Sequence, residues 1–308
     1  MSPRPSEVVA HGGRVYHLGL APGELAERII LVGDPARANR VAARFDVLEH
    51  EVREREYVTL TGRISGERIS VMGTGIGTDN VEIALVEAHV VHSMDLETGE
   101  ALPDPPQLTF LRVGTSGGAR EDVAPGTLAI AAYGLGLDST GLFYEGPPED
   151  AVVTALEDRA TQVLRDGEDP ASRFRGAVRP YASRADRSLV AALAAAAERA
   201  DLAHEVGVTC ALPGFYAPSG RYIAGLRATL PDLKQRLGTV EAHGVRLLNF
   251  EMESSLLFLL AGQLGHRAAT ICPILSTPGS HGTLIDGKAA VEPVIDLALG
   301  VICDAERA

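Results

Sequence analysis

Short apolar segments alternate with helical patterns along most of this 308-residue chain, and no other feature restricts its fold as strongly. The apolar segments have strand character, and the segments between them repeat apolar residues at helical spacing. This alternation predicts an α/β protein whose mostly parallel or mixed sheet is covered on both faces by helices. Strands are expected at residues 29–32, 57–61, 69–72, 108–113, 127–132, 205–209, 246–250 and 268–275. Helices are expected at residues 35–45, 80–94, 151–165, 188–200, 251–264 and 288–302.

The bulk composition favours one domain. A chain of this length with 45% hydrophobic residues can bury one large core, so residues 1–308 are expected to form a single domain. Apolar stretches such as 256–262 are far too short to cross a bilayer, and the N-terminus lacks a basic segment followed by an apolar one. The cysteines Cys210, Cys272 and Cys303 match no disulfide or metal-ligand spacing. We therefore expect a cytoplasmic protein with no membrane partner.

The charge balance narrows the class of ligand. A formal charge of −13 repels polyanions, and no basic patch offsets it, so a nucleic-acid partner is not expected. A small anionic substrate remains compatible with this charge. The chain has two lysines, Lys234 and Lys288, so a phosphate site would have to be built from arginines and backbone N–H groups.

The first candidate anion site follows the strand at 29–32. The sequence Gly33-Asp34-Pro35-Ala36-Arg37 places a proline where it opens a helix, which brings backbone N–H groups and Arg37 to a helix N-terminus. The alternative is an N-capped turn with a surface arginine. The motif alone leaves both interpretations open.

A second candidate is Arg112, near the end of the apolar strand at 108–113. A charged residue there is costly unless an anion or a carboxylate pairs with it, so Arg112 is either part of a buried ion pair or a ligand-binding group. The loop that follows, through Thr115 to Gly118, offers hydroxyls and accessible backbone. It is no ATP-binding loop, because no Gly-Lys-Ser/Thr sequence follows.

Two further segments carry polar or aromatic groups. Glu251 and Glu253 stand at a predicted strand-to-helix junction, and residues two apart do not share a helix face, so one is expected to point to the cavity while the other is structural. Carboxylates suit the vicinal hydroxyls of a ribose, although acidic residues in a first helical turn can also complement the helix dipole. Phe215 and Tyr216 precede Arg221 in an irregular segment, which suits a planar, carbonyl-bearing heterocycle or is an ordinary loop.

These motifs, taken together, resemble the uridine phosphorylases. Seven of them occur in the family's order along the chain: 16–20, 33–37, 55–57, 74–77, 110–118, 215–222 and 249–254. The family belongs to the hexameric nucleoside phosphorylase superfamily. The resemblance therefore implies a three-layer α/β/α fold with a mixed central sheet, and a homo-oligomer whose active sites are shared across a subunit interface.

The resemblance also implies three groups of site residues. Around phosphate it places Gly33, Arg37, Arg55, Arg112 and Thr115. Around ribose it places His17, Thr115, Glu251, Met252 and Glu253. Facing the base it places Phe215, Ser219 and Arg221. Arg112, Arg221 and Glu253 would be the catalytic residues, while Arg55 and His17 would act from a neighbouring subunit.

Two departures from the family pattern concern the base. Ser219 stands where uridine phosphorylases have a glutamine that reads the uracil amide edge, and its shorter side chain would need a bridging water, so the preference for uracil stays open. Purine nucleoside phosphorylases place an aspartate after the strand at 268–275, but here no aspartate occurs between the start of that strand and Asp286.

The expected function is therefore phosphorolysis of uridine or a related pyrimidine nucleoside to the free base and (deoxy)ribose 1-phosphate. A purine nucleoside phosphorylase, a hydrolytic nucleosidase and a non-catalytic nucleoside-binding paralogue remain as alternatives. Inorganic phosphate is the expected co-substrate, with no other cofactor. Glu56 resembles a potassium-binding glutamate between subunits, which leaves a monovalent cation open. His89 and His92 lie in one predicted helix with no third ligand in view, so they are interpreted as helix surface or interface and no metal site is predicted.

Overall fold

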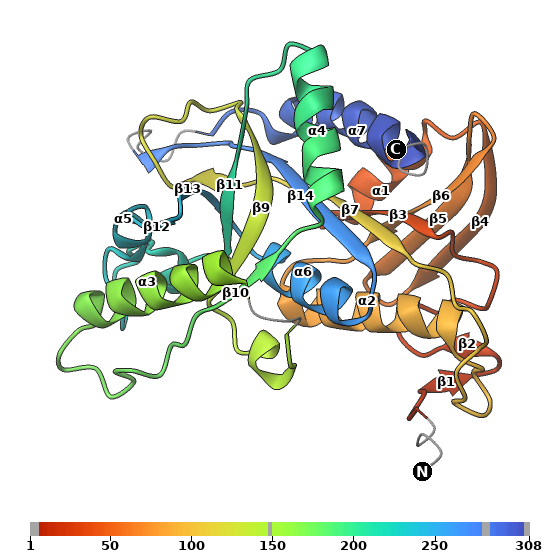
Figure 1. Ribbon diagram of the computed structural model, residues 1–308, viewed down its shortest axis with the longest axis horizontal. Helices are drawn as coiled ribbons and strands as arrows, with labels where there is room; N and C mark the ends of the chain where they lie inside the picture. The colour runs from red at the N-terminus through yellow and green to blue at the C-terminus, as the bar shows by residue number, and fades with distance from the viewer. Residues whose placement is uncertain (1–5, 147–149, 279–283, 305–308) are drawn as a thin grey trace.

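The computed structural model describes residues 6–146, 150–278 and 284–304. Within these ranges, twelve strands form one mixed sheet, and helices lie on both of its faces (Figure 1). This arrangement confirms the predicted three-layer α/β/α fold with a mixed central sheet. None of the helices in the described ranges combines the length and apolar character that a bilayer span requires.

The sheet and its helices contain all of the elements expected from the sequence, within a few residues. The strands of the sheet are β3 (Arg28–Val32), β4 (Val47–Glu54), β5 (Tyr57–Ile64), β6 (Glu67–Gly73), β7 (Thr109–Val113), β8 (Gly117–Gly118), β9 (Leu128–Gly136), β10 (Tyr181–Arg184), β11 (His204–Ala211), β12 (Glu241–Ala242), β13 (Val245–Glu251) and β14 (Arg267–Pro273). The helices are α1 (Pro35–Ala42), α2 (Thr78–Ser93), α3 (Ala151–Gly167), α4 (Arg187–Arg199), α5 (Leu233–Leu237), α6 (Ser254–Gln263) and α7 (Gly287–Asp304). Short 3-10 turns, η1 (Thr140–Phe143) and η2 (Ala217–Ser219), and a separate ribbon of β1 (Ala10–His11) and β2 (Arg14–Val15) complete the list.

The strands follow one another across the sheet in the order β12-β13-β11-β9-β14-β7-β3-β6-β5-β4. Strands β14, β7, β3 and β6 run parallel to one another, and so do β9, β11 and β13. The two sets meet where β14 pairs antiparallel with β9. The sheet is therefore mixed: two parallel sets run in opposite directions, and further antiparallel pairs are made by β4, β5, β8, β10 and β12.

A short crossing segment joins these halves at the pocket. After β7, the chain forms β8, in which Gly117 pairs with Phe250 and Gly118 with Asn249 of β13. This pairing carries the loop that follows Arg112 directly to the end of β13. Segments more than a hundred residues apart in sequence thereby lie side by side.

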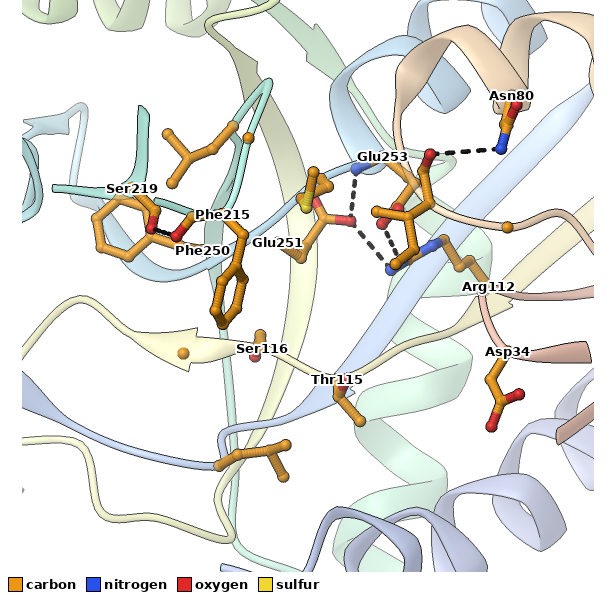
Figure 2. A pocket seen from close by; sticks show the side chains of 18 of the residues that line it. Asp34, Asn80, Arg112, Thr115, Ser116, Phe215, Ser219, Phe250, Glu251 and Glu253 are labelled. Carbon is orange, nitrogen blue, oxygen red and sulfur yellow. Dashed lines mark hydrogen bonds and ion pairs between the residues drawn. The ribbon is translucent and has the colours of Figure 1, made fainter. Parts of the chain in front are cut away.

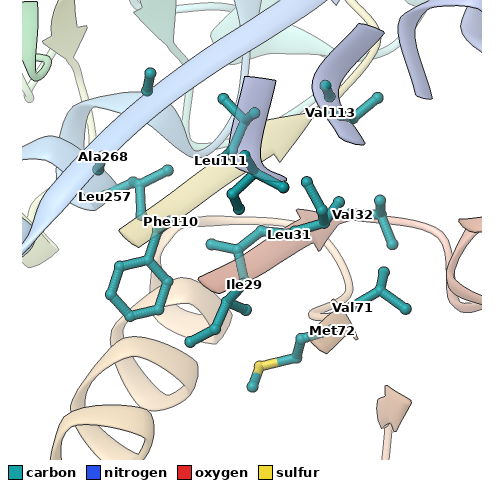
Figure 3. Packing of buried hydrophobic residues seen from close by; sticks show 14 of the residues in the cluster. Ile29, Leu31, Val32, Val71, Met72, Phe110, Leu111, Val113, Leu257 and Ala268 are labelled. Carbon is teal, nitrogen blue, oxygen red and sulfur yellow. The ribbon is translucent and has the colours of Figure 1, made fainter. Parts of the chain in front are cut away.

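The central strands are apolar on both faces because helices cover both faces of the sheet. Helices α1 and α7 are joined by ion pairs of Arg40 and Arg44 with Glu292, and they cover one face together with α4 (Figure 1). Helices α2 and α6 pack on the other face. Side chains of β3, β6 and β7 fill the space between these layers, as Figure 3 shows for Ile29 and Phe110.

Three local features differ from the sequence-based expectation. Strand β4 was not predicted because it is an exposed, charge-rich edge strand, held by its main-chain pairing with β5. Helix α6 begins at Ser254 rather than at residue 251, since Glu251 is still the last residue of β13. His89 and His92, expected at a helix surface or interface, are partly buried within the chain itself, and His89 Nδ1 lies 3.0 Å from Nε2 of His266, the residue just before β14.

Candidate active site

A cavity of about 880 Å³ opens where β3, β7, β11 and β13 end. Its volume lies within the range typical of small-molecule sites. Figure 2 shows Phe215, Ser219 and Phe250 at one end, Arg112 toward the other, and Glu251 between them. The predicted site residues that line it are Gly33, Arg37, Arg112, Thr115, Phe215, Ser219, Arg221, Glu251, Met252 and Glu253, together with Glu56.

Arg112 forms the buried centre of this cavity. Its side chain is 6% exposed, its Nη1 lies 3.0 Å from Glu251 Oε2, and its Nη2 contacts Glu253 Oε2 (Figure 2). Burial alone would lower the pKa of Arg112, but the carboxylates of Glu253 and then Glu251 more than offset it and raise that pKa. The expectation of a buried ion pair is therefore correct, and the same guanidinium faces the cavity.

The two carboxylates are held in place by backbone N–H groups. Glu251 accepts hydrogen bonds from the N–H groups of Glu253 (2.9 Å) and Ser254 (3.1 Å). Glu253 accepts one from Gly77 (2.8 Å), whose φ of 103° favours glycine. Burial raises the pKa of Glu251; the Arg112 charge opposes this effect, and the Glu253 charge adds to it. Both side chains are fixed before any ligand arrives.

The prediction that one of the two glutamates points to the cavity while the other is structural is wrong. Both carboxylates contact Arg112 and both line the cavity. The helix rule does not apply, because Glu251 ends a strand and Glu253 precedes the first helical residue. In such a non-helical segment, side chains two positions apart return to the same side, so the pair grips one guanidinium.

Gly114 is required by the close packing around Arg112. A Cβ at this position would overlap the Arg112 guanidinium and would stand 2.7 Å from Cys272 Sγ. The loop after β7 can therefore pass the buried arginine only as a bare backbone. Thr115, which follows, is left at the cavity wall.

Arg37 is a second cation at the same end of the cavity. Asp34 caps α1 by accepting from Ala36 N at 2.9 Å, so the N-capped turn and the arginine side chain at the helix start both exist. The Arg37 side chain is partly buried, which rules out a surface arginine: its Nη1 donates to Val113 O at 3.0 Å, and its buried Nε has no partner among the described atoms. Burial lowers the pKa of Arg37, and Arg112 adds to the shift. An anion bound here would relieve both costs.

The opposite end of the cavity is aromatic and cationic. The Arg221 Cζ lies 3.7 Å from the centroid of the Phe215 ring. Arg221 Nη1 donates to Phe215 O at 2.7 Å and to Ser219 Oγ. Ser219 Oγ itself donates to the Phe215 carbonyl, and the residue is 3% exposed. Ser219 therefore positions Arg221 and has no free hydrogen to present to a ligand.

His17 and Arg55 lie outside the cavity lining. His17 Nδ1 is 2.7 Å from Glu87 Oε1, and its backbone N–H also donates to that carboxylate. Arg55 is exposed, with its Cζ 4.8 Å from the ring centroid of Tyr16. Neither residue reaches the pocket of its own chain.

Sequence reasoning missed several lining residues. Lys234 and Phe250 line the aromatic end, and Lys234 Nζ stands 5.3 Å from the Phe250 ring centroid. Lys234 belongs to the five-residue helix α5, whose Leu-Lys-Gln-Arg-Leu sequence has the pattern of an ordinary surface helix. Only the scarcity of lysine in the chain could have drawn attention to it. Asn80 and Ser276 are further lining residues without a motif, and Ile76 lies in the motif at 74–77 but was assigned no role.

Comparisons with known proteins point to one family. The family model described as the phosphorylase superfamily matches residues 27–296. A uridine phosphorylase of Thermococcus kodakarensis is 28% identical over 264 residues, covering 86% of this chain and 78% of the relative. A uridine phosphorylase of Haemophilus influenzae is 26% identical, covering 96% and 98%. The crystal structure of a Trypanosoma brucei nucleoside phosphorylase that shows uridine phosphorylase activity superposes with a TM-score of 0.81 at 27% identity, covering 96% and 98%. All residues that line the cavity fall within the matched segment.

Proposed function

Because the chain belongs to the phosphorylase superfamily, we propose that it cleaves the N-glycosidic bond of a nucleoside with inorganic phosphate. Uridine or a related pyrimidine nucleoside is the substrate, and the products are the free base and a pentose 1-phosphate. One observation carries the proposal: a desolvated arginine with an unpaired Nε lies in the same cavity as an arginine gripped by two glutamates. An anion and a sugar diol need these two kinds of group side by side.

Phosphate binds at the arginine end in this proposal. Arg37 supplies its free Nε, Arg112 its positive charge, and Gly33 and Thr115 complete the site with backbone and hydroxyl donors. The unpaired Nε of Arg37 is the strongest support, because a buried donor without an acceptor is costly. With few lysines in the chain, arginines carry the whole positive charge of this end.

The sugar and the base occupy the rest of the cavity. Glu253 and Met252 hold the ribose, with Glu251 beside them, and Thr115 touches both phosphate and sugar. Phe215 and Arg221, which stack on each other, face the base, with Ser219 fixing the arginine rather than contacting the substrate. The fixed carboxylates support this assignment, since their orientation costs no further ordering when the substrate binds.

The course of the proposed reaction follows from the positions of the bound phosphate and the arginines. A phosphate oxygen attacks C1′ as the bond from C1′ to the base nitrogen breaks, and the bonding electron pair leaves with the base. Positive charge develops on the sugar and is stabilised by the phosphate dianion, while Arg221 stabilises the negative charge on the departing base. Arg112, Arg221 and Glu253 are thus the proposed catalytic residues, and no covalent enzyme intermediate is needed.

Assembly and location are further parts of the proposal. His17 and Arg55 complete the site of a neighbouring subunit in a homo-oligomer, which agrees with their position outside their own cavity. Glu56, at the cavity edge, is the candidate ligand for a monovalent cation, and no other cofactor is invoked. Residues 1–308 form a single domain of a cytoplasmic enzyme. The free cysteines Cys210, Cys272 and Cys303 suit a reducing compartment.

A phosphate-dependent assay over uridine, thymidine, inosine and adenosine tests the function. We expect turnover of uridine and thymidine that requires phosphate and yields a pentose 1-phosphate. Turnover that is unchanged without phosphate would favour a hydrolytic nucleosidase, and a strong preference for inosine or adenosine would favour a purine nucleoside phosphorylase. Binding of nucleosides without turnover of any would favour a non-catalytic paralogue.

A further inference from the structure

Lys234 is a cation at the aromatic end of the cavity, and the proposed function assigns it no role. It lines the cavity from α5, and its Nζ stands 5.3 Å from the centroid of the Phe250 ring. A Cβ built on Gly117, in the crossing segment β8, would lie 3.7 Å from the same Nζ. These two distances place the ammonium group beside the Phe250 ring, and Figure 2 shows that ring at the same end of the cavity as Phe215 and Ser219.

The ammonium has no acceptor among the described residues. Its Nζ forms no hydrogen bond or ion pair with any described side chain, and its one aromatic contact is with Phe250. The ionisable groups that face it are the Arg221 guanidinium, from the loop after η2, and the buried Cys210 thiol of β11. Helix α3 packs against α5, but there the contact is made by Arg236 rather than by Lys234: Arg236 Nη1 donates to the Asp166 carbonyl of α3. A partly buried ammonium with no carboxylate nearby favours a ligand that brings an acceptor.

The neighbouring polar groups are already engaged. Ser219 donates to the Phe215 carbonyl and accepts from Arg221, so its hydroxyl cannot replace the amide of a base-reading glutamine. Arg221 donates hydrogen bonds from its Nη1 to that carbonyl and to Ser219 Oγ. Lys234 and the remaining nitrogens of Arg221 are therefore the uncommitted cationic donors that we find at this end of the described cavity.

We infer that Lys234 is a specificity-determining residue that donates a hydrogen bond to a carbonyl oxygen of the base and so selects nucleosides with an oxo group at that edge. The inference rests on the proposed function and deepens it. An ammonium group has three donors and no acceptor, so it binds the carbonyl of uracil or thymine but faces another donor in the amino group of cytosine or adenine. Negative charge that reaches the carbonyl as the glycosidic bond breaks strengthens the same contact.

The pH dependence of catalysis gives an independent readout. Burial lowers the pKa of Lys234 to about 8; Arg221 adds to this shift and Cys210 opposes it. The contact is lost as the pH rises through that value. The kcat/KM for uridine should therefore decline above about pH 8 in the wild type, and this decline should be absent when Lys234 is replaced.

The test compares Lys234→Met, Lys234→Gln and Lys288→Met in the intact protein. Lys288, the other lysine of the chain, is exposed on α7 and serves as the matched control. Lys234→Met should lower kcat/KM for uridine by about ten- to a hundredfold, the effect of losing one charge-assisted hydrogen bond. Its KM for phosphate and its melting temperature should stay at the wild-type values. Lys234→Gln should recover part of the uridine activity while narrowing the preference for uridine over cytidine, because an amide can also accept.

Three results would overturn the inference. They are a Lys234→Met variant within twofold of the wild type on uridine, an alkaline limb that persists in both Lys234 variants, and a rise in KM that falls on phosphate rather than on the nucleoside. Failure of the proposed function looks different, since the wild type itself would then consume no phosphate with any nucleoside.

Discussion

Arg112 and Glu253 lie 141 positions apart in the chain, yet their side chains form an ion pair that is almost completely removed from solvent. Strand β7 supplies the arginine, and the turn before α6 supplies the glutamate. The crossing segment β8 brings these two parts together by pairing with β13. Arg112, the cation at the proposed phosphate end of the cavity, and Glu253, the carboxylate at the proposed sugar end, therefore form one structural unit.

Replacing Arg112 with methionine should damage both catalysis and stability. Two buried carboxylates would lose their counter-charge, which costs about 3–5 kcal/mol, and kcat/KM should fall by a comparable free energy. Urea unfolding and steady-state kinetics measure the two effects. The double variant Arg112→Met/Glu251→Gln should regain part of the stability and none of the activity. The exposed Arg63, substituted by alanine, is the control; near-normal turnover of the Arg112 variant would contradict the assignment.

Replacing Arg37 with methionine should separate binding from stability. The KM for phosphate should rise about ten- to a hundredfold as a charge-assisted contact is lost. The melting temperature without phosphate should stay the same or rise, since an uncompensated buried donor disappears. Thermal melting with and without phosphate, alongside kinetics, gives both numbers. Arg40→Met, one turn later and paired with Glu292, should show the opposite pattern: lower stability with an unchanged KM for phosphate.

Stability should fall on mild acidification because of His266. Burial lowers the pKa of His266 to about 4, with His89 and His92 adding to the shift, and its Nδ1 lies 3.2 Å from Leu108 N, a contact that needs an unprotonated nitrogen. Since the folded-state pKa is below the unfolded value, the stabilisation is complete above about pH 6.5 and is lost as the pH falls toward 4. The loss between pH 7 and pH 5 should be about 1 kcal/mol from this group, because its partial exposure to solvent screens the effect.

Calorimetry of the wild type and of His266→Gln isolates that contribution, because other titrating groups are common to both proteins. The variant should lose less stability than the wild type over this pH interval, and the exposed His11→Gln should behave like the wild type. Parallel curves for the wild type and His266→Gln would show that His266 does not carry the effect.

If active sites are shared between subunits, mixing two weakly active variants should restore part of the activity. Arg55→Met and Arg221→Met should each be weakly active alone. If Arg55 of one subunit completes the site that holds Arg221 of its neighbour, random pairing of the two variants leaves about a quarter of the sites intact. Activity after dissociation and re-association of an equimolar mixture measures this fraction. Activity no higher than that of the unmixed variants would mean that both arginines serve the same chain's site.

Several residues that line the candidate site could be predicted because they stand out from their local sequence. Arg112 is a charge within an apolar strand, and Arg37 follows a proline that opens a helix. Such conflicts between a residue and its surroundings are visible in the sequence itself. The alternation of strands and helices likewise determined the layers, since each element is covered on a face set by its own apolar pattern.

The remainder depends on long-range pairing that no local pattern encodes. The crossing of β8 to β13 follows from main-chain pairing between segments far apart in sequence, and the direction of Glu251 depends on where β13 ends. Lys234 belongs to a helix that looks like surface, and it becomes part of the cavity only through the fold of the loop before it. Strand β4 is so polar that only its pairing with β5 defines it.

The antiparallel contact of β9 with β14 has a consequence for how ligands enter and leave. The main-chain ladder continues from one edge of the described sheet to the other, so Arg112 on β7 and Glu251 on β13 belong to one continuous framework. We therefore expect admission of the nucleoside and escape of the base to depend on movement of the loops around the cavity, among them residues 212–221.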